Sequence, residues 1–312
     1  MTELAVLLEP RHGATYDQIL AMAQVAERSG LDAFFRSDHY LGVDPADPDY
    51  RSTDSWITLA GLARETSRIR LGTLTTAGTF RLPGVMAVAV STANAMSGGR
   101  IELGLGTGWY AEEHEQFGIP FPPMAERFDR LEEQLEILTG LWRQPAGEPY
   151  SFAGEHFRLT GNAAFPGKWP PTRLIVGGMG PKRTPALAAR YADEFNAAFA
   201  PLPQAKERFA LVRALREQAG RDPAGLKTSI VIPRVCIGRD ADEVQRRREI
   251  LGPPIGEIPD QGLSGTPEQA AEQLAEWIAI GTDRIYIHLL DVEDLDHVRL
   301  LGEQLRPLLQ HG

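Results

Sequence analysis

LAVLLEPRHGATYDQILAMAQVAERSGLDAFFR, residues 4–36, is the stretch from which the fold can be predicted. It begins with LAVLL (4–8) and ends with DAFFR (32–36), two short apolar runs typical of buried strands. The residues at about 16–28 are predicted to form a helix that ends at Gly30. A strand, a helix and a strand in this order predict two parallel strands joined by a crossover helix.

The same unit recurs along the chain. Each apolar run is followed by a helical pattern, and the clearest helix spans residues 126–142, where leucines recur at 131, 135, 138 and 141. Parallel strands that are apolar on both faces predict an α/β fold, a closed (β/α)8 TIM-type barrel. A doubly wound open sheet of the dinucleotide-binding kind is the alternative. The runs are residues 4–8, 32–36, 68–74, 100–106, 172–178, 194–199, 226–238 and 284–290.

We expect residues 1–312 to form a single barrel domain with insertions after strands four and seven. The first insertion is a Pro/Gly-rich stretch at about 143–171, which contains the hairpin-like sequence PYSFAGEHFRL. The second contains the loop PPIGEIPDQG, residues 253–262. We interpret both as lids or walls of a substrate site.

The composition argues against several kinds of partner. The net charge of −10, from 32 basic and 42 acidic residues, disfavours binding to nucleic acid or to an anionic membrane. A single cysteine, Cys236, excludes an internal disulfide and fits a reducing compartment. The seven histidines include no H-x-H or H-E-x-x-H spacing, so no metal site is predicted. Since no signal-peptide pattern and no membrane-spanning apolar stretch is found, we expect a cytoplasmic protein.

Polar residues follow the second predicted strand, where its apolar run stops at Ser37, Asp38 and His39. Barrel active sites lie at the C-terminal ends of the strands, so Asp38 and His39 are predicted to line the mouth, with His39 as a ligand donor or proton donor. The three residues cannot form a hydrolytic triad, because neighbours on an extended chain point in opposite directions. An Asx-type turn with His39 partly exposed is the structural alternative.

GLGTGWY, residues 104–110, follows the fourth predicted strand. It nearly matches the dinucleotide fingerprint, but Trp109 stands where the third glycine is required. The glycines leave the backbone bare, so a flat ring could lie against it with Trp109 as a wall. A turn that the glycines merely shape is the alternative.

GGMGPKRT, residues 177–184, lies between the fifth predicted strand and a helix. The first helical turn would contain Lys182, Arg183 and Thr184. Free amides and the helix dipole favour an anion at such a position, whereas basic residues are unfavourable there without one. This stretch therefore predicts a phosphate site.

These stretches belong to a larger set: GLDAFFRSDHY, RLGTLTTAGTFRLPGVMA, SGGRIELGLGTGWYAEEHEQFGIPF, ERFDRLEEQLEIL, LIVGGMGPKRTPALAARYADEFNA and GTPEQAAEQLAEWIAIGTDRIYIHLL. As a set they resemble the luciferase-like monooxygenase superfamily, and more narrowly its actinobacterial F420-dependent oxidoreductases. The resemblance spans nearly the whole chain. It implies a TIM-type barrel, usually a homodimer, that holds a deazaflavin across the C-terminal ends of its strands.

The resemblance also implies roles for single residues. Asp38 and His39 match a pair near the reactive part of the deazaflavin ring, and they are the implied catalytic residues. Leu74 and Thr75 match a strand-three bulge, often a non-proline cis peptide, that supports the ring from behind. The family's sugar-phosphate dehydrogenases have a glutamate in place of Trp109, which argues against a sugar phosphate substrate. The implied cofactor-binding residues are Asp38, His39, Leu74, Thr75, Gly106, Thr107, Gly108, Trp109, Gly177, Gly178, Lys182, Arg183 and Thr184.

The implied activity is hydride transfer between bound coenzyme F420 and a small organic substrate. The reacting group would be a C=C bond, an imine or a carbonyl–alcohol pair, with His39 as a proton donor. Glu113 and His114 fit a W-x-x-x-E pattern in which they brace the loop. Two alternatives remain, a monooxygenase that uses reduced FMN and a flavin-binding protein without turnover. Sequence separates F420 from FMN poorly, because both have a tricyclic ring and one phosphate.

Overall fold

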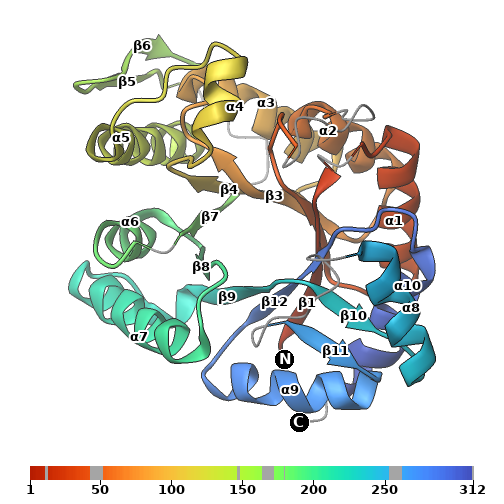
Figure 1. Ribbon diagram of the computed structural model, residues 1–312. Coiled ribbons are helices and arrows are strands. Elements are labelled where there is room, and N and C mark those ends of the chain that lie inside the picture. Colours follow the sequence, from red (N-terminus) through yellow and green to blue (C-terminus); the bar gives the residue numbers. More distant parts are fainter. Residues whose placement is uncertain are drawn as a thin grey trace.

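Parallel strands close into an eight-stranded barrel in the computed structural model, which describes residues 1–10, 13–42, 52–145, 148–163, 172–178, 180–252 and 262–310 (Figure 1). The closed sheet confirms the predicted (β/α)8 barrel and excludes the open, doubly wound sheet. Around the barrel, β12 pairs with β1 and closes the ring. In ring order the strands are β1 (Glu3–Leu8), β2 (Ala33–Arg36), β3 (Arg70–Ala77), β4 (Ile101–Gly106), β7 (Arg173–Gly177), β8 (Glu194–Ala197), β9 (Lys227–Ile232) and β12 (Arg284–Leu289).

Helices cover the outside of the barrel and connect successive strands (Figure 1). Local signals begin two of them: a capping box of Thr15 and Gln18 starts α1, and Asp54 caps α2. None of the described helices is long and apolar enough to span a bilayer. The helices are α1 (Tyr16–Arg28), α2 (Ser55–Glu65), α3 (Pro83–Met96), α4 (Ala111–Gln116), α5 (Met124–Arg143), α6 (Arg183–Tyr191), α7 (Leu202–Gln218), α8 (Ala241–Leu251), α9 (Pro267–Ala279) and α10 (Leu295–Leu300), followed by a π-helical turn (Leu301–Leu305) and α11 (Arg306–Leu308).

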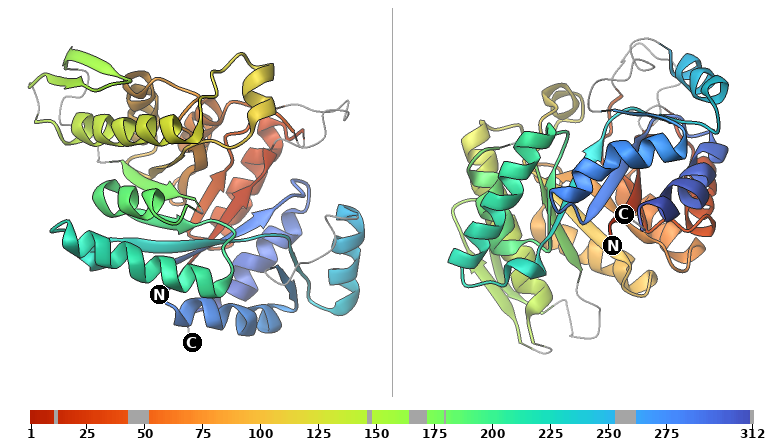
Figure 2. Two further views of the ribbon diagram at one scale, coloured as in Figure 1. Left: turned by 60° about the vertical axis from the view of Figure 1, so that its left-hand side comes forward. Right: turned by 90° about the horizontal axis from the view of Figure 1, so that it is seen from below.

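The first predicted insertion contains an antiparallel hairpin of β5 (Tyr150–Ala153) and β6 (Arg158–Asn162). Figure 2 shows the hairpin outside the barrel, beside α5. Glu133 of α5 accepts hydrogen bonds from the backbone amides of residues 155–157, which fastens the hairpin turn to that helix. Residues 146–147 and 164–171 of this insertion lie outside the described residues.

The predicted seventh strand, 226–238, is divided in two. β9 stays in the barrel, while β10 (Val235–Ile237) pairs with β11 (Leu263–Gly265) in a small separate sheet. Pro233 has no amide hydrogen to donate, and Arg234 has a φ of 49°, so the run cannot continue as one regular strand. Most of the predicted loop 253–262 lies outside the described residues.

The inside of the barrel has an apolar middle layer. Its two aromatic members, Phe35 and Tyr286, meet edge to face with ring centroids 5.1 Å apart. Side chains fill the interior, so the barrel is a packed core rather than a pore. The layer consists of Ala5, Leu7, Ala33, Phe35, Leu74, Ile175, Val231 and Tyr286.

A buried charged cluster closes the N-terminal end of the barrel around Arg284, whose side chain is fully buried. Arg284 pairs with Glu3 of β1, Glu102 of β4 and Glu194 of β8 at 2.6–2.9 Å. Burial raises the pKa of Glu102, but Arg284 and Arg70 outweigh it and lower that pKa to about 2. One cation therefore joins strands from different parts of the ring.

Replacing Arg284 with Met is expected to lower the free energy of unfolding by about 3–5 kcal/mol, because the buried Glu194 would lose its cation and Glu102 would keep only the partly exposed Arg70. Chemical denaturation measures this change. As a control, Arg190→Met breaks the exposed pair with Glu132 and is expected to change stability by less than about 1 kcal/mol. Equal losses in the two variants would contradict this account of the cluster.

Candidate active site

The C-terminal ends of the strands bring the predicted site residues to one end of the barrel, which we call the mouth. Asp38 and His39 directly follow β2, Thr75 lies in β3, Trp109 follows β4 and Gly177 ends β7. Because the strands are parallel, all five lie at the end where barrel enzymes have their active sites.

Asp38 is buried, and its carboxylate is fully used by neighbouring side chains. Ser55 and Thr76 donate hydrogen bonds to it at 2.6 and 2.8 Å, and Arg81 donates to both of its oxygens. Asp38 thereby ties the end of β2 to α2 and β3. A carboxylate with this many donors is held firmly in place, so its geometry fits a positioning role, and the catalytic role of Asp38 stays a prediction.

Arg81 is central to this network, and sequence reasoning did not predict these contacts. Its guanidinium pairs with Asp38 and with Asp54 (2.7 Å), and it donates to the hydroxyl of Tyr40. Burial raises the pKa of Asp54, but the Ile57 amide and Arg81 outweigh it, so that pKa is lowered. One feature of the sequence could have indicated this role. Arg81 lies just before the start of α3, where the helix dipole disfavours positive charge.

His39 is the candidate acid–base residue. Its side chain is 17% exposed, and its Nδ1 lies 3.0 Å from Oε2 of Glu113. Its Nε2 has no hydrogen-bond partner among the described residues. Trp109, which is 65% exposed, lies edge-on to the imidazole with ring centroids 5.4 Å apart, and Tyr110 stacks on Trp109. The imidazole is therefore held at one nitrogen and walled by an indole, with the other nitrogen left for a ligand.

Glu113 and His114 brace the segment after β4, as the W-x-x-x-E pattern predicts. Glu113 accepts hydrogen bonds from the backbone amides of Tyr40 and Leu41. The His114 ring lies 2.6 Å from both the Thr79 hydroxyl and the Tyr110 carbonyl. The loops after β2 and β4 are thereby joined.

Leu74 and Thr75 lie at the base of the mouth. The peptide bond between them is cis, and β3 gains one residue against β4 within 73–76. Leu74 belongs to the apolar layer, and the Thr75 side chain lies beside Gly106 and Gly177. An added Cβ at either glycine would come within 3.2–3.3 Å of that side chain. These glycines thus make room for Thr75, a role that the sequence did not reveal.

The glycine loop after β7 packs against Thr184, which is buried and lies 3.5 Å from a Cβ built at Gly178. Lys182 precedes α6 with its side chain exposed. Arg183 turns away from the loop and pairs with Asp129 of α5 at 2.6 Å. Arg183 is one of the residues predicted to hold a phosphate. In the structure its charge is paired with Asp129 of α5.

A second histidine lies at the mouth. His288 Nε2 is 3.7 Å from Oε2 of Glu9, and Ser37 donates a hydrogen bond to the other oxygen of Glu9. The Phe199 ring lies 5.9 Å from the imidazole, centroid to centroid. Pairing of β1 with both β2 and β12 brings these distant residues together.

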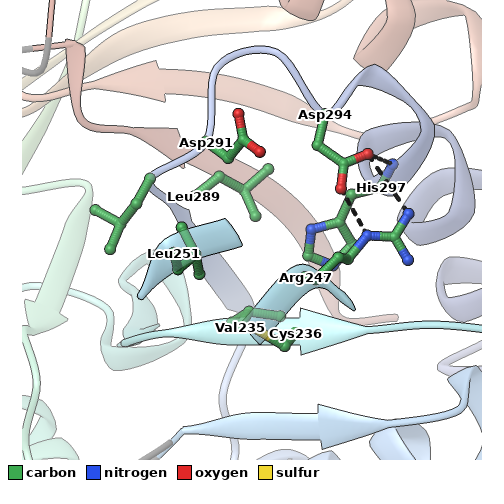
Figure 3. A pocket seen from close by; sticks show the side chains of 9 residues that line it. Val235, Cys236, Arg247, Leu251, Leu289, Asp291, Asp294 and His297 are labelled. Atoms are coloured by element: carbon green, nitrogen blue, oxygen red, sulfur yellow. Dashed lines mark hydrogen bonds and ion pairs between the residues drawn. The ribbon is translucent and has the colours of Figure 1, made fainter. Parts of the chain in front are cut away.

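A pocket away from the residues predicted for the site lies between β10, α8 and the segment after β12 (Figure 3). Arg247 pairs with Asp294 at 2.6 Å, and His297 accepts a hydrogen bond from the amide of Ile237. Burial lowers the pKa of His297 to about 4, and burial raises the pKa of the Cys236 thiol. These groups satisfy one another and fasten the small sheet to the barrel.

Among the described residues, no group of three or more His, Cys, Asp or Glu side chains is placed to hold a metal ion.

Comparison with known proteins gives matches over most of the chain. Residues 2–255 match the family described as luciferase-like monooxygenase. An F420-dependent glucose-6-phosphate dehydrogenase of Nakamurella multipartita is 28% identical, over 94% of this chain and 92% of the relative. An F420-dependent hydroxymycolic acid dehydrogenase of Mycobacterium tuberculosis is 32% identical, over 86% of this chain and 73% of the relative.

The barrel also matches solved structures. An F420-dependent secondary alcohol dehydrogenase, solved with an F420–acetone adduct, superimposes with a TM-score of 0.82 and covers 99% of both chains. Because its identity is 20%, this likeness concerns the fold.

Replacing Asp38 with Asn would keep an acceptor for only one of the two hydroxyls that donate to it, those of Ser55 and Thr76, and would remove the charge opposite Arg81. We expect the free energy of unfolding to fall by about 2–4 kcal/mol. Asp129→Asn, which weakens the exposed pair with Arg183, should change it by less than about 1 kcal/mol. Thermal and urea unfolding would measure both. An Asp38→Asn protein as stable as the wild type would argue against the positioning role.

Proposed function

Because the chain belongs to the luciferase-like monooxygenase family, we propose that it is an F420-dependent oxidoreductase that moves a hydride between bound coenzyme F420 and a small organic substrate. The observation that carries the proposal is His39, whose Nε2 has no partner among the residues that the structure describes and lies at the mouth beside an exposed indole. The names of the two curated relatives above support the choice of F420 over FMN.

The residues at the mouth fit a flat ring with a phosphate group. Gly106 and Gly177 present bare backbone beside Thr75, where a side chain would fill the space. Gly178 has a φ of 144°, a backbone conformation that favours glycine, and its loop leads to the N-terminus of α6. The residues proposed to hold the cofactor are Asp38 (through Thr76), His39, Leu74, Thr75, Gly106, Thr107, Gly108, Trp109, Gly177, Gly178, Lys182 and Thr184.

Coenzyme F420 would supply the hydride chemistry when bound. The chain would handle the proton: as the alcohol carbon gives its hydride to the cofactor, His39 Nε2 would accept the hydroxyl proton and the carbonyl would form. In the reverse direction the imidazolium returns that proton to the carbonyl oxygen. Trp109 would limit the access of water to the imidazole.

A fluorescence titration with F420, beside FMN at equal concentration, tests the cofactor. We expect F420 to bind with a dissociation constant in the low micromolar range, about −8 kcal/mol, and FMN to bind weakly. In His39→Asn, F420 binding should persist while turnover of an alcohol found by screening falls by roughly 10²–10⁴-fold. His156→Asn, in the hairpin turn, is the control and should retain full turnover. FMN binding with F420 ignored would overturn the proposal.

We also propose that the whole chain acts as one barrel domain, works in the cytoplasm and forms a homodimer through α2 and α3. Helix α3 contains no charged residue, yet Val85 and Val88 are 66% and 42% exposed. Leu82, just before α3, is 66% exposed, and Ile57 of neighbouring α2 is 76% exposed. An apolar face of this kind is suited to cover by a second copy.

The double substitution Val85→Glu and Val88→Glu is therefore expected to give a monomer in sedimentation analysis, because two buried carboxylates would lie unpaired in the interface. Ile250→Glu, at a 69% exposed position on α8, serves as the control and should leave a dimer. A wild-type monomer, or a double variant that remains dimeric, would contradict the interface.

A further inference from the structure

Glu113 lies behind His39 with no exposed side-chain surface. Its Oε1 accepts hydrogen bonds from the amides of Tyr40 and Leu41, and its Oε2 faces Nδ1 of His39 at 3.0 Å. The carboxylate is thus held in place by two backbone N–H groups, which can act only as hydrogen-bond donors.

These contacts indicate whether Glu113 or His39 carries the hydrogen that lies between them. Burial raises the pKa of Glu113, but the His39 hydrogen bond and the two backbone amides outweigh it, so the pKa lies below its usual value. An ionised carboxylate only accepts hydrogen bonds. The hydrogen between Glu113 and His39 therefore belongs to Nδ1 of the imidazole.

We propose that Glu113 is a positioning residue that fixes the neutral form of His39 as the Nδ1-protonated tautomer. In that tautomer Nε2 has a lone pair, and it is the nitrogen without a partner among the described residues. His39 is thereby prepared to accept a proton at the mouth. This inference rests on the proposed function in one respect only: the group that donates the proton to Nε2 is an alcohol hydroxyl.

The same contacts join two loops. Glu113 lies on α4, which follows β4, whereas its three partners lie in the segment after β2. Trp109, at the start of the α4 segment, also touches the His39 ring. The contacts between these two loops therefore hold the imidazole against Glu113 on one side and beside the indole on another.

Glu113→Gln gives a sharp test, because glutamine has the same shape. Its single oxygen is needed by the two backbone amides, so its NH2 group must face His39 Nδ1. That nitrogen would then have to accept, and the proton would move to Nε2. Glu112→Gln is the matched control, since Glu112 is the exposed neighbour on the same helix.

Nitrogen-15 NMR of protein with labelled histidine reads the tautomer without cofactor or substrate, and His39→Asn identifies the His39 signals. We expect Nδ1–H in the wild type and in Glu112→Gln, and Nε2–H in Glu113→Gln. Turnover with F420 should fall by roughly 10²–10⁴-fold in Glu113→Gln, while F420 binding is retained.

An Nε2–H tautomer in the wild-type protein would overturn the proposal, and this result does not depend on whether Glu113→Gln folds. An unchanged tautomer in a folded Glu113→Gln protein would also overturn it. Failure of the wild type to bind F420 would refute the proposed function alone, since the tautomer is measured without that cofactor.

Discussion

The buried charge of Arg284 is the constraint on which the closed barrel depends. Its partners come from β1, β4 and β8, and although Glu102 also pairs with Arg70 and Glu3 with Lys227, those two cations are partly exposed whereas Arg284 is fully buried. A strand order that left Glu102 or Glu194 unpaired would place a bare carboxylate in the interior, at a cost of several kcal/mol. The cluster therefore favours one arrangement of the strands, and the apolar layer next to it fills the remaining interior.

Paired charges also hold the residues at the mouth of the barrel in place. Asp38 and Arg81 form a second buried ion pair, and through Ser55 and Thr76 it connects β2, β3 and α2. Thr76 follows Thr75, so the base of the mouth is fixed by the same pair. Charged groups at the N-terminal end thus serve the barrel's closure, while those at the C-terminal end hold reactive groups in place.

Several site residues predicted from sequence do come together, and the exceptions have a common cause. Asp38 and His39 are neighbours in sequence, but the Asp38 carboxylate is enclosed by Arg81, whereas the His39 side chain is partly exposed and open to a ligand. Arg183 lies in the predicted helical turn, yet its charge goes to Asp129, on a helix far back in the chain. The partners that decide these roles lie on other loops, and local patterns do not reveal them.

The sequence by itself determined the architecture: runs of apolar residues alternating with helical patterns specify parallel strands, and the ends of those runs mark where polar residues gather. These features depend on neighbours within a few residues, so periodicity and turn chemistry reveal them. Only the tertiary structure decided which carboxylate is enclosed, which glycines make room for Thr75, and which nitrogen of His39 is bound by Glu113. Those outcomes are set by contacts of about 3 Å between segments that the chain separates by tens of residues, and the side-by-side pairing of the parallel strands brings such segments together.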